Sequence, residues 1–203
     1  MATIGAAILA GGASRRMGRD KSFVMINGKP MIQHVIDQLG VLELPTAIIT
    51  NTPEQYSAFG LPCYTDAIPG RGSLGGLYTA LLHSSADYTL CVACDIPFLH
   101  PGLLRHLLDL REGYDVVVPL TDGRAHGLHA VYARRCQPAM QTQIAAGNLR
   151  IVELYRSLRV RYVTEDEVRV FDPALRSLRN LNTLADVAQA HDEDQSSPGD
   201  NGS

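Results

Sequence analysis

The stretch Ile4-Gly-Ala-Ala-Ile-Leu-Ala-Gly-Gly-Ala-Ser-Arg-Arg-Met-Gly-Arg-Asp-Lys21 decides the fold, because it joins an apolar segment to a glycine-rich, basic loop. Residues 4–9 have no polar face, which is typical of a central parallel strand covered on both sides. In the loop that follows, glycines let backbone N–H groups approach an anion, and Arg15, Arg16 and Lys21 supply positive charge. The segment therefore predicts a strand that ends in a phosphate-binding loop.

The loop differs from a Walker loop, because Gly12 and Gly18 are six positions apart and Lys21 does not follow a glycine. A turn with a structural role alone is the alternative interpretation. Lysine usage favours the functional one, since Lys21 and Lys29 are the only lysines among 18 lysine and arginine residues. Lysine suits a site that needs a compact point charge, although chance could also explain its placement.

Outward from this loop, short apolar segments alternate with helical patterns. Such alternation predicts an α/β fold of three layers, in which a mostly parallel sheet is flanked by helices and ligands bind at the carboxyl ends of the strands. Pro30 is expected in the first turn of the first helix. We expect further strands at 46–50, 89–94, 115–120, 128–133 and 160–164, and helices at 29–39, 75–86, 101–111, 134–146 and 149–158.

Composition narrows the classes of function. The chain has 203 residues, 45% of them hydrophobic, and a formal net charge of -3, which predicts one domain over residues 1–190 without a basic field for nucleic acid. No apolar run reaches the length of a membrane span, and no signal peptide is evident, so we expect a cytoplasmic protein. Residues 191–203 are acidic and polar, which predicts a disordered tail.

A second glycine-rich segment runs from Asp66 to Gly76. Within it, Gly70-Arg-Gly72-Ser-Leu-Gly75 matches the dinucleotide fingerprint, but it lies in mid-chain and does not follow the first strand, so we reject that match. The segment is better explained as a loop that packs against a base and ribose, with backbone groups reading the edge of the base.

A carboxylate and two amides complete the candidate groups. Asp95 ends an apolar strand, where it could cap the next helix or act as an oxygen ligand for Mg²⁺ beside bound phosphates. Asn180 and Asn182 precede the last helix and could simply form its entry, with Thr183 and Asp186 in a capping-box pattern.

Other sequence motifs do not predict a metal or catalytic site. Cys91 and Cys94 form C-x-x-C, but residues three apart on a strand face opposite sides, so we expect free buried thiols and no metal held between them. Neither H-E-x-x-H nor G-x-S-x-G occurs, which argues against a zinc protease or an esterase.

Four motifs in chain order resemble the molybdenum cofactor guanylyltransferases of the nucleotidyltransferase superfamily, over residues 4 to about 190. The resemblance implies a Rossmann-like nucleotidyltransferase fold. The motifs are Leu9-Ala-Gly-Gly12 with Arg16-Met-Gly18 and Asp20-Lys21; Asp66 with Pro69-Gly70 and Leu74-Gly-Gly76; Cys94-Asp95-Ile-Pro-Phe98; and Asn180-Leu-Asn182-Thr183.

The resemblance also implies a reaction and its participants. GMP would pass from GTP to molybdenum-bound molybdopterin, giving the guanine dinucleotide cofactor and pyrophosphate, without a covalent intermediate. Asp95 would hold Mg²⁺, and transient contact with molybdenum-insertion or molybdoenzyme-maturation proteins would be compatible with this role. The implied catalytic residues are Arg16, Lys21 and Asp95; the nucleotide-binding residues are Leu9, Ala10, Gly11, Gly12, Lys21, Asn51, Asp66, Gly75 and Asp95; and the pterin-binding residues are Asn180 and Asn182.

Two alternative functions stay open at this point. The chain could be a CTP-dependent cytidylyltransferase acting on the pterin or on a small phosphorylated alcohol, although Ala10-Gly-Gly12 and Asp20-Lys21 favour the guanylyl reaction. It could also be a non-catalytic nucleotide-binding subunit, although the presence of Lys21 and Asp95 favours an enzyme.

We predict that the tail from Asp192 onward is dispensable. It has no apolar side chain to bury, and its acidic residues would repel a phosphate ligand. Truncation before Asp192 should change the free energy of unfolding by no more than about 0.5 kcal/mol. Thermal melting and turnover of the truncated chain would check this, and a clear loss of either would mean that the tail docks on the domain.

Overall fold

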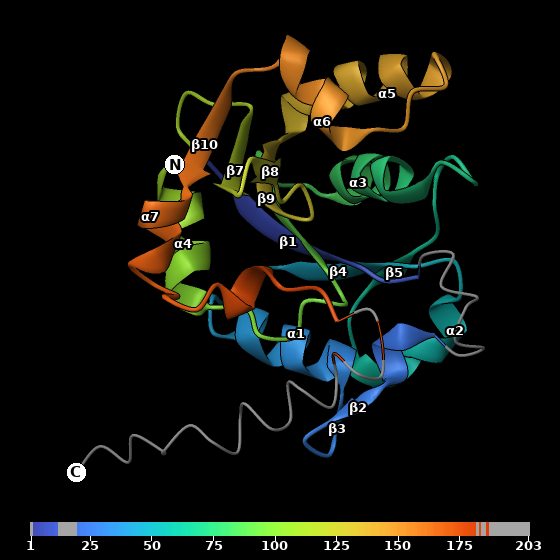
Figure 1. The fold of residues 1–203 in the computed structure, drawn as a ribbon. Coiled ribbons are helices and arrows are strands. Elements are labelled where there is room, and N and C mark those ends of the chain that lie inside the picture. The colour runs from blue at the N-terminus through green and yellow to red at the C-terminus, as the bar shows by residue number, and fades with distance from the viewer. Residues whose placement is uncertain (1, 12–19, 182, 184–185, 187–203) are drawn as a thin grey trace.

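The computed structural model describes residues 2–11, 20–181, 183 and 186, and it has a central sheet with helices on both faces (Figure 1). The predicted tail, 191–203, lies outside the described residues. The strands follow the order β10-β7-β9-β6-β1-β4-β5, with β8 paired to β7. Their bounds are β1 (Ile4–Leu9), β4 (Thr46–Ile49), β5 (Cys63–Tyr64), β6 (Tyr88–Ala93), β7 (Val116–Thr121), β8 (Arg124–Ala125), β9 (His129–Ala133) and β10 (Val160–Thr164).

Strand β1 is central and pairs in parallel with β4 on one side and β6 on the other. Ile8 lies opposite Ile48 and Val92, and all three side chains are fully buried. The absence of a polar face in residues 4–9 is thus explained by cover on both sides of the sheet. The predicted central parallel strand is confirmed.

The sheet departs from parallel pairing at β9, which runs antiparallel to both of its neighbours, β6 and β7. All five residues of β9 are buried, as are all six of β6, which pairs in parallel with β1, so burial pattern alone does not reveal the direction of β9. The prediction of a mostly parallel sheet is nevertheless correct, because β1, β4, β5, β6, β7 and β10 pair in parallel where they meet.

Helices cover both faces of the sheet. Figure 1 shows α1 on one side and α3 with α5 on the other, which gives the predicted three layers. Helix α1 buries Ile32, Val35 and Leu39 on one face, in agreement with the helical spacing of its apolar residues. The bounds are α1 (Met31–Gly40), α2 (Pro53–Tyr56), α3 (Gly72–His83), α4 (Pro101–Asp109), α5 (Gln137–Ala145), α6 (Ile151–Leu154) and α7 (Glu165–Arg169).

The first expected helix, 29–39, begins too early. Lys29–Pro30 form the short strand β3, which pairs antiparallel with β2 (Met25–Ile26). Asn27 and Gly28 have φ angles of 48° and 77°, as the tight turn of a hairpin requires. Pro30 is therefore the N-cap of α1, with φ -58° and ψ 144°, and the prediction of a first-turn proline is wrong.

Several other boundaries also differ. Helix α3 begins and ends three residues before the expected 75–86, and the expected helix 134–146 opens with a 3-10 turn at Arg134–Cys136. The expected helix 149–158 is the short α6 followed by a 3-10 turn at Tyr155–Ser157. Strand β5 and helices α2 and α7 were not expected, although a capping box of Thr164 and Glu167 marks the start of α7.

A small second core lies beside the main one. It consists of Ile26, Met31 and Leu181, with Val24 and Phe98 packed against it. It holds the β2–β3 hairpin and the C-terminal segment together. Just beyond Leu181, Thr183 N–H donates to Asp186 Oδ2 (2.8 Å) and Asp186 N–H donates to Thr183 Oγ1 (3.1 Å), which confirms the predicted capping pattern.

Two sequence-based exclusions can be compared with the described residues. All four cysteines are free, and Cys91 and Cys94 are buried, as expected. Within the ranges given above, no helix is both long enough and apolar enough to cross a membrane.

His129 in β9 makes stability depend on pH. It is fully buried, and neither ring nitrogen has a hydrogen-bond partner among the described residues. Burial, with a smaller effect of nearby His126, lowers the pKa of His129 from 6.5 to about 3, while Asp172 opposes the shift. The unfolded chain therefore binds a proton between pH 6.5 and pH 3 that the folded chain does not, so stability falls as pH falls through this range.

We predict that the free energy of unfolding falls by about 2 kcal/mol between pH 7 and pH 5 because of this group alone. Leucine fills a similar volume and does not titrate, so His129→Leu should flatten the pH dependence. Urea unfolding of both proteins at several pH values would measure the difference. Equal pH slopes would mean that His129 keeps an ordinary pKa in the folded state.

Candidate active site

The candidate site is formed at the carboxyl ends of β1, β4, β5 and β6, which lie side by side in the sheet. Ala10 N–H donates to the Ile49 carbonyl (2.8 Å), and Cys94 N–H donates to the Leu9 carbonyl (3.0 Å). The first residues after β1 and β6 are thus each bonded to the last residue of a neighbouring strand, β4 and β1 respectively. The predicted nucleotide-binding residues Leu9 and Ala10 lie at this junction.

Gly11 ends the described part of the first loop. Its φ is +94°, a left-handed conformation that favours glycine, and a Cβ there would lie 3.5 Å from Thr50 Oγ1. Glycine is thus required two residues after β1, as expected at the start of a loop that brings its backbone to a ligand. Gly12, Arg16 and Asn182, which the resemblance placed in the site, lie outside the described residues.

Asn51 and Asp66 are brought together by reciprocal hydrogen bonds. Asn51 Nδ2 donates to Asp66 Oδ2 (2.9 Å), and Asp66 N–H donates to Asn51 Oδ1 (3.2 Å). Asn51 follows β4 and Asp66 follows β5, so this pair joins two neighbouring strand ends. A Cβ on Gly76 would lie 3.0 Å from Leu9 Cδ2 and 3.8 Å from Asp66 Oδ1, which places the Asn51–Asp66 pair beside β1.

The second glycine-rich segment is helical from Gly72 onward, because α3 begins there, whereas the expected helix 75–86 already included Gly75 and Gly76. Gly75 N–H donates to the Arg71 carbonyl (3.1 Å), and the Gly75 carbonyl accepts from Thr79 Oγ1 (2.8 Å). Both backbone groups of Gly75 are therefore already bonded within the protein. The missing side chain of Gly75 permits close packing, since a Cβ there would lie 2.8 Å from Arg71 Cβ. That Gly75 binds the nucleotide stays a prediction.

The two lysines have different surroundings. Lys29 is exposed and donates to Asp37 Oδ2 (2.8 Å), a surface ion pair that lowers the pKa of Asp37. Lys21 is half-buried at the start of a 3-10 turn, Lys21–Phe23, and its positive charge acts on Asp95. Only Lys21 therefore belongs to the candidate site.

Asp95 is half-buried just beyond β6, and burial raises the pKa of its carboxyl. A hydrogen bond from Asn180 Nδ2 to Asp95 Oδ1 (2.9 Å) and the charge of Lys21 oppose that rise. In addition, Leu181 N–H donates to the Asp95 carbonyl (2.9 Å). Asn180, expected on the pterin side, is thus in direct contact with the carboxylate expected on the nucleotide side.

The residues present fit a magnesium ion that is shared with a substrate. Among the described residues, no three His, Cys, Asp or Glu side chains gather into a metal cluster, so these side chains do not form a cage by themselves. Mg²⁺ is usually held by one or two carboxylates together with substrate phosphates. A cation beside Asp95 would also favour the ionised form, which burial disfavours.

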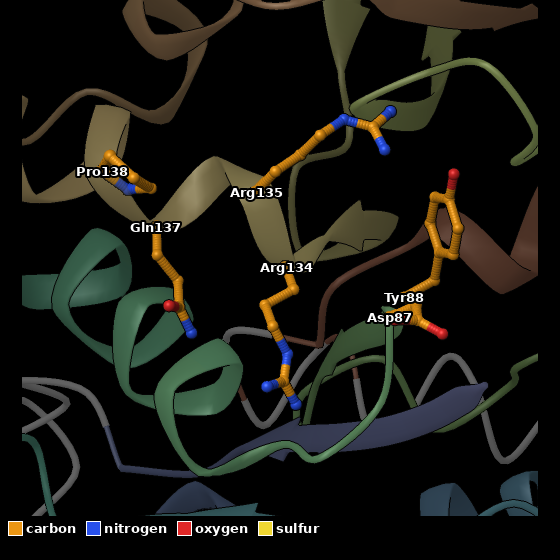
Figure 2. A pocket seen from close by; sticks show the side chains of 6 residues that line it. All are labelled: Asp87, Tyr88, Arg134, Arg135, Gln137 and Pro138. Atoms are coloured by element: carbon orange, nitrogen blue, oxygen red, sulfur yellow. The ribbon is translucent and has the colours of Figure 1, made fainter. Parts of the chain in front are cut away.

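A hollow of about 420 Å³ lies elsewhere in the molecule (Figure 2). Tyr88 begins β6, whereas Asp95 follows its other end, so the hollow lies at the opposite end of that strand. Arg134 Nε donates to the Ala86 carbonyl (3.1 Å), and Arg135 is paired with Asp115. None of the predicted site residues lines this hollow, which is formed by Asp87, Tyr88, Arg134, Arg135, Gln137 and Pro138.

A mostly parallel sheet with a glycine and a partly buried carboxylate just beyond adjacent strands, and a lysine whose charge acts on that carboxylate, is the architecture of a nucleotidyltransferase. Residues 6–165 match the family described as MobA-like NTP transferase domain, and the chain belongs to this family. The family resemblance of the four sequence motifs is thereby confirmed.

Individual relatives agree with this assignment. The molybdenum cofactor guanylyltransferase of Desulfosudis oleivorans is 36% identical over 185 residues, 90% of this chain and 92% of that protein. The probable molybdenum cofactor guanylyltransferase of Pelotomaculum thermopropionicum is 34% identical over 183 residues, 90% of this chain and 89% of that protein. In the solved structures, molybdopterin-guanine dinucleotide biosynthesis protein A from Archaeoglobus fulgidus is similar with a TM-score of 0.82 and 28% identity, covering 94% of this chain and 98% of that chain.

Sequence reasoning missed two residues close to the site. Tyr56 in α2 and Ser22 beside Lys21 are fully buried and hydrogen-bonded to each other, with Tyr56 Oη 2.8 Å from Ser22 Oγ. A separation of 34 positions leaves no local pattern that could reveal this contact. The motif Asp20-Lys21 was the only available signal that this segment matters.

We predict that Asn180→Ala shifts the acid limb of the pH–rate profile to higher pH. The Asn180 hydrogen bond lowers the pKa of Asp95, so its removal raises that pKa and leaves less of the ionised carboxylate at a given acidic pH. The profile of kcat/KM would show the shift. Asn51→Ala, which changes a different amide of the site, should leave the acid limb in place.

A uniform loss of rate without a shift would contradict this prediction. Such a result would mean that Asn180 only binds the acceptor, the role that the family resemblance implied for it.

Proposed function

We propose that this protein transfers GMP from GTP to the terminal phosphate of molybdenum-bound molybdopterin, forming molybdopterin guanine dinucleotide and pyrophosphate. The observation that carries the proposal is that the charge of Lys21, which follows the first loop, acts on Asp95 just beyond β6, in a chain whose relatives are named for this activity. The two groups come from different loops and provide a cation and an oxygen ligand for one triphosphate.

The reaction is a displacement at the α-phosphorus of GTP. An oxygen of the acceptor phosphate forms a bond to that phosphorus, and the bond to the β-phosphate oxygen breaks, so pyrophosphate leaves. No general base is required, because a phosphate monoester is largely ionised at neutral pH. The task of the protein is to align the acceptor with the α-phosphate and to stabilise negative charge that develops on the leaving group.

Lys21 is proposed to bind the phosphates, and Arg16 is proposed to assist it. Asp95 would hold Mg²⁺ together with phosphate oxygens, and the ion would supply positive charge to the leaving pyrophosphate. Asn180 keeps Asp95 ionised and oriented through its hydrogen bond to Oδ1. The strand ends carrying Leu9, Ala10 and Gly11, with the Asn51–Asp66 pair, are proposed to hold the nucleoside. Asn182 is proposed to contact the pterin.

The choice of nucleotide is tested by supplying each one separately. The purified protein is incubated with Mg²⁺, molybdopterin and GTP, CTP, ATP or UTP, and pyrophosphate release is measured. A site built to hydrogen-bond guanine should favour GTP by roughly 10⁴-fold. Comparable release with CTP would assign the protein to cytidylyl transfer, and tight GTP binding without release would indicate a non-catalytic subunit.

The product is needed where molybdoenzymes mature, so we propose that the protein acts in the cytoplasm. Transient contact with molybdenum-insertion or molybdoenzyme-maturation proteins would let the product pass on without release. A pull-down of the protein in the presence and absence of product would test this contact.

Asp95→Asn is predicted to lower kcat by roughly 10²- to 10³-fold, about 3 to 4 kcal/mol, comparable to losing one preorganised oxyanion contact. Asparagine keeps the size of the side chain but removes its charge. GTP affinity should fall less, because the extra charge on pyrophosphate appears only in the transition state. Steady-state rates across a Mg²⁺ titration, combined with GTP binding measurements, would separate the two effects.

Asp37→Asn is the matched control, because Asp37 is an exposed carboxylate whose partner is Lys29. It should leave both parameters near those of the native protein. An Asp95→Asn variant that stays fast and equally magnesium-dependent would refute Asp95 as the metal ligand and leave it a structural role.

A further inference from the structure

A chain of polar groups, buried except for the half-buried Asp20 at one end, contacts the segment that carries Lys21. Tyr56 is fully buried, and its hydroxyl donates to Asp20 Oδ2 (2.7 Å). The same hydroxyl lies 2.8 Å from Ser22 Oγ, which in turn lies 3.2 Å from Cys94 Sγ. The ends of this chain, Asp20 and Cys94, immediately precede Lys21 and Asp95 in the sequence.

The hydrogen bonds engage both oxygens of the Asp20 carboxylate. Ser22 N–H donates to Oδ1 (3.0 Å), which caps the 3-10 turn that begins with Lys21, while Tyr56 donates to Oδ2. Burial strongly raises the pKa of Tyr56, so the phenol stays neutral and keeps its donor proton at any physiological pH. A half-buried carboxylate directly beside Lys21 is thus turned toward the protein interior.

Packing alone does not account for the Tyr56 hydroxyl. The Tyr56 ring contacts Phe23 and Phe59, with centroid distances of 5.0 and 6.2 Å. Phenylalanine would keep these apolar contacts and avoid the cost of burying a hydroxyl. What tyrosine adds over phenylalanine here is the contact of its hydroxyl with Asp20 and Ser22, the two residues that flank Lys21.

We propose that Tyr56 is a positioning residue for nucleotide binding. Its hydroxyl fixes the Asp20 carboxylate, and through it the short turn, so that Lys21 is held in place against Asp95 to receive the triphosphate. The proposal rests on the proposed role of Lys21 in binding phosphates. It adds a residue from α2, a helix that contributes no group to the site described above.

The test is a double-mutant cycle on GTP affinity with Mg²⁺ present, measured by isothermal titration calorimetry without acceptor. Tyr56→Phe should weaken GTP binding about 10-fold, and Lys21→Ala should weaken it at least as much. If Tyr56 acts through Lys21, adding Tyr56→Phe to Lys21→Ala should cause no further loss. A second loss of the same size in the double variant would overturn the proposal, because it would indicate a general loosening of the fold.

Tyr155→Phe is the matched control, because it removes another buried tyrosine hydroxyl, one that lies 3.0 Å from Tyr132 Oη in a different part of the fold. It should leave GTP affinity unchanged. Asp20→Asn is the second test variant, since it replaces the acceptor of the Tyr56 proton without touching the buried ring. It should reproduce the loss seen with Tyr56→Phe and again have no added effect in Lys21→Ala.

The outcomes separate the two proposals. If Lys21→Ala binds GTP as tightly as the native protein, the assigned function of Lys21 fails. If Lys21→Ala weakens binding but Tyr56→Phe and Asp20→Asn do not, the phosphate role of Lys21 stands and Tyr56 is a packing residue only.

Discussion

The parallel pairing of β1 with β4 and β6 is the constraint on which the site depends. It brings three strand ends to one edge, and backbone hydrogen bonds continue the pairing by one residue, from Ala10 to Ile49 and from Cys94 to Leu9. Gly11 and Asp95 leave the sheet from adjacent positions as a result. The site is therefore positioned by the carboxyl ends of the central strands, and later parts of the chain pack onto it.

Much of this edge could be predicted, because its signals are local. A run without a polar face predicted β1, and a carboxylate after an apolar run predicted Asp95 beyond β6. The hairpin that displaced the start of α1 was signalled by Asn27-Gly28 but was outweighed by the helical spacing that follows.

Contacts between distant segments could not be predicted in this way. Asn180 lies 85 positions from Asp95, and Tyr56 lies 36 positions from Asp20, so no spacing rule connects them. The reason for a glycine at position 75 could not be predicted either, since only the structure shows that a Cβ there would lie 2.8 Å from Arg71 Cβ. Local sequence patterns identified the charged side chains of the site. Their hydrogen-bond partners depend on tertiary structure and could not be read from those patterns.

The attachment of Asn180 and Leu181 to Asp95 has a consequence for biosynthesis. The chain emerges from the ribosome in order, and the sheet strands up to β10 are complete at Thr164. The donors to Asp95, and Leu181 of the small core, arrive afterwards. A nascent chain can therefore assemble its sheet while the carboxylate still lacks these partners, so the site is completed only after all the strands that support it have been made.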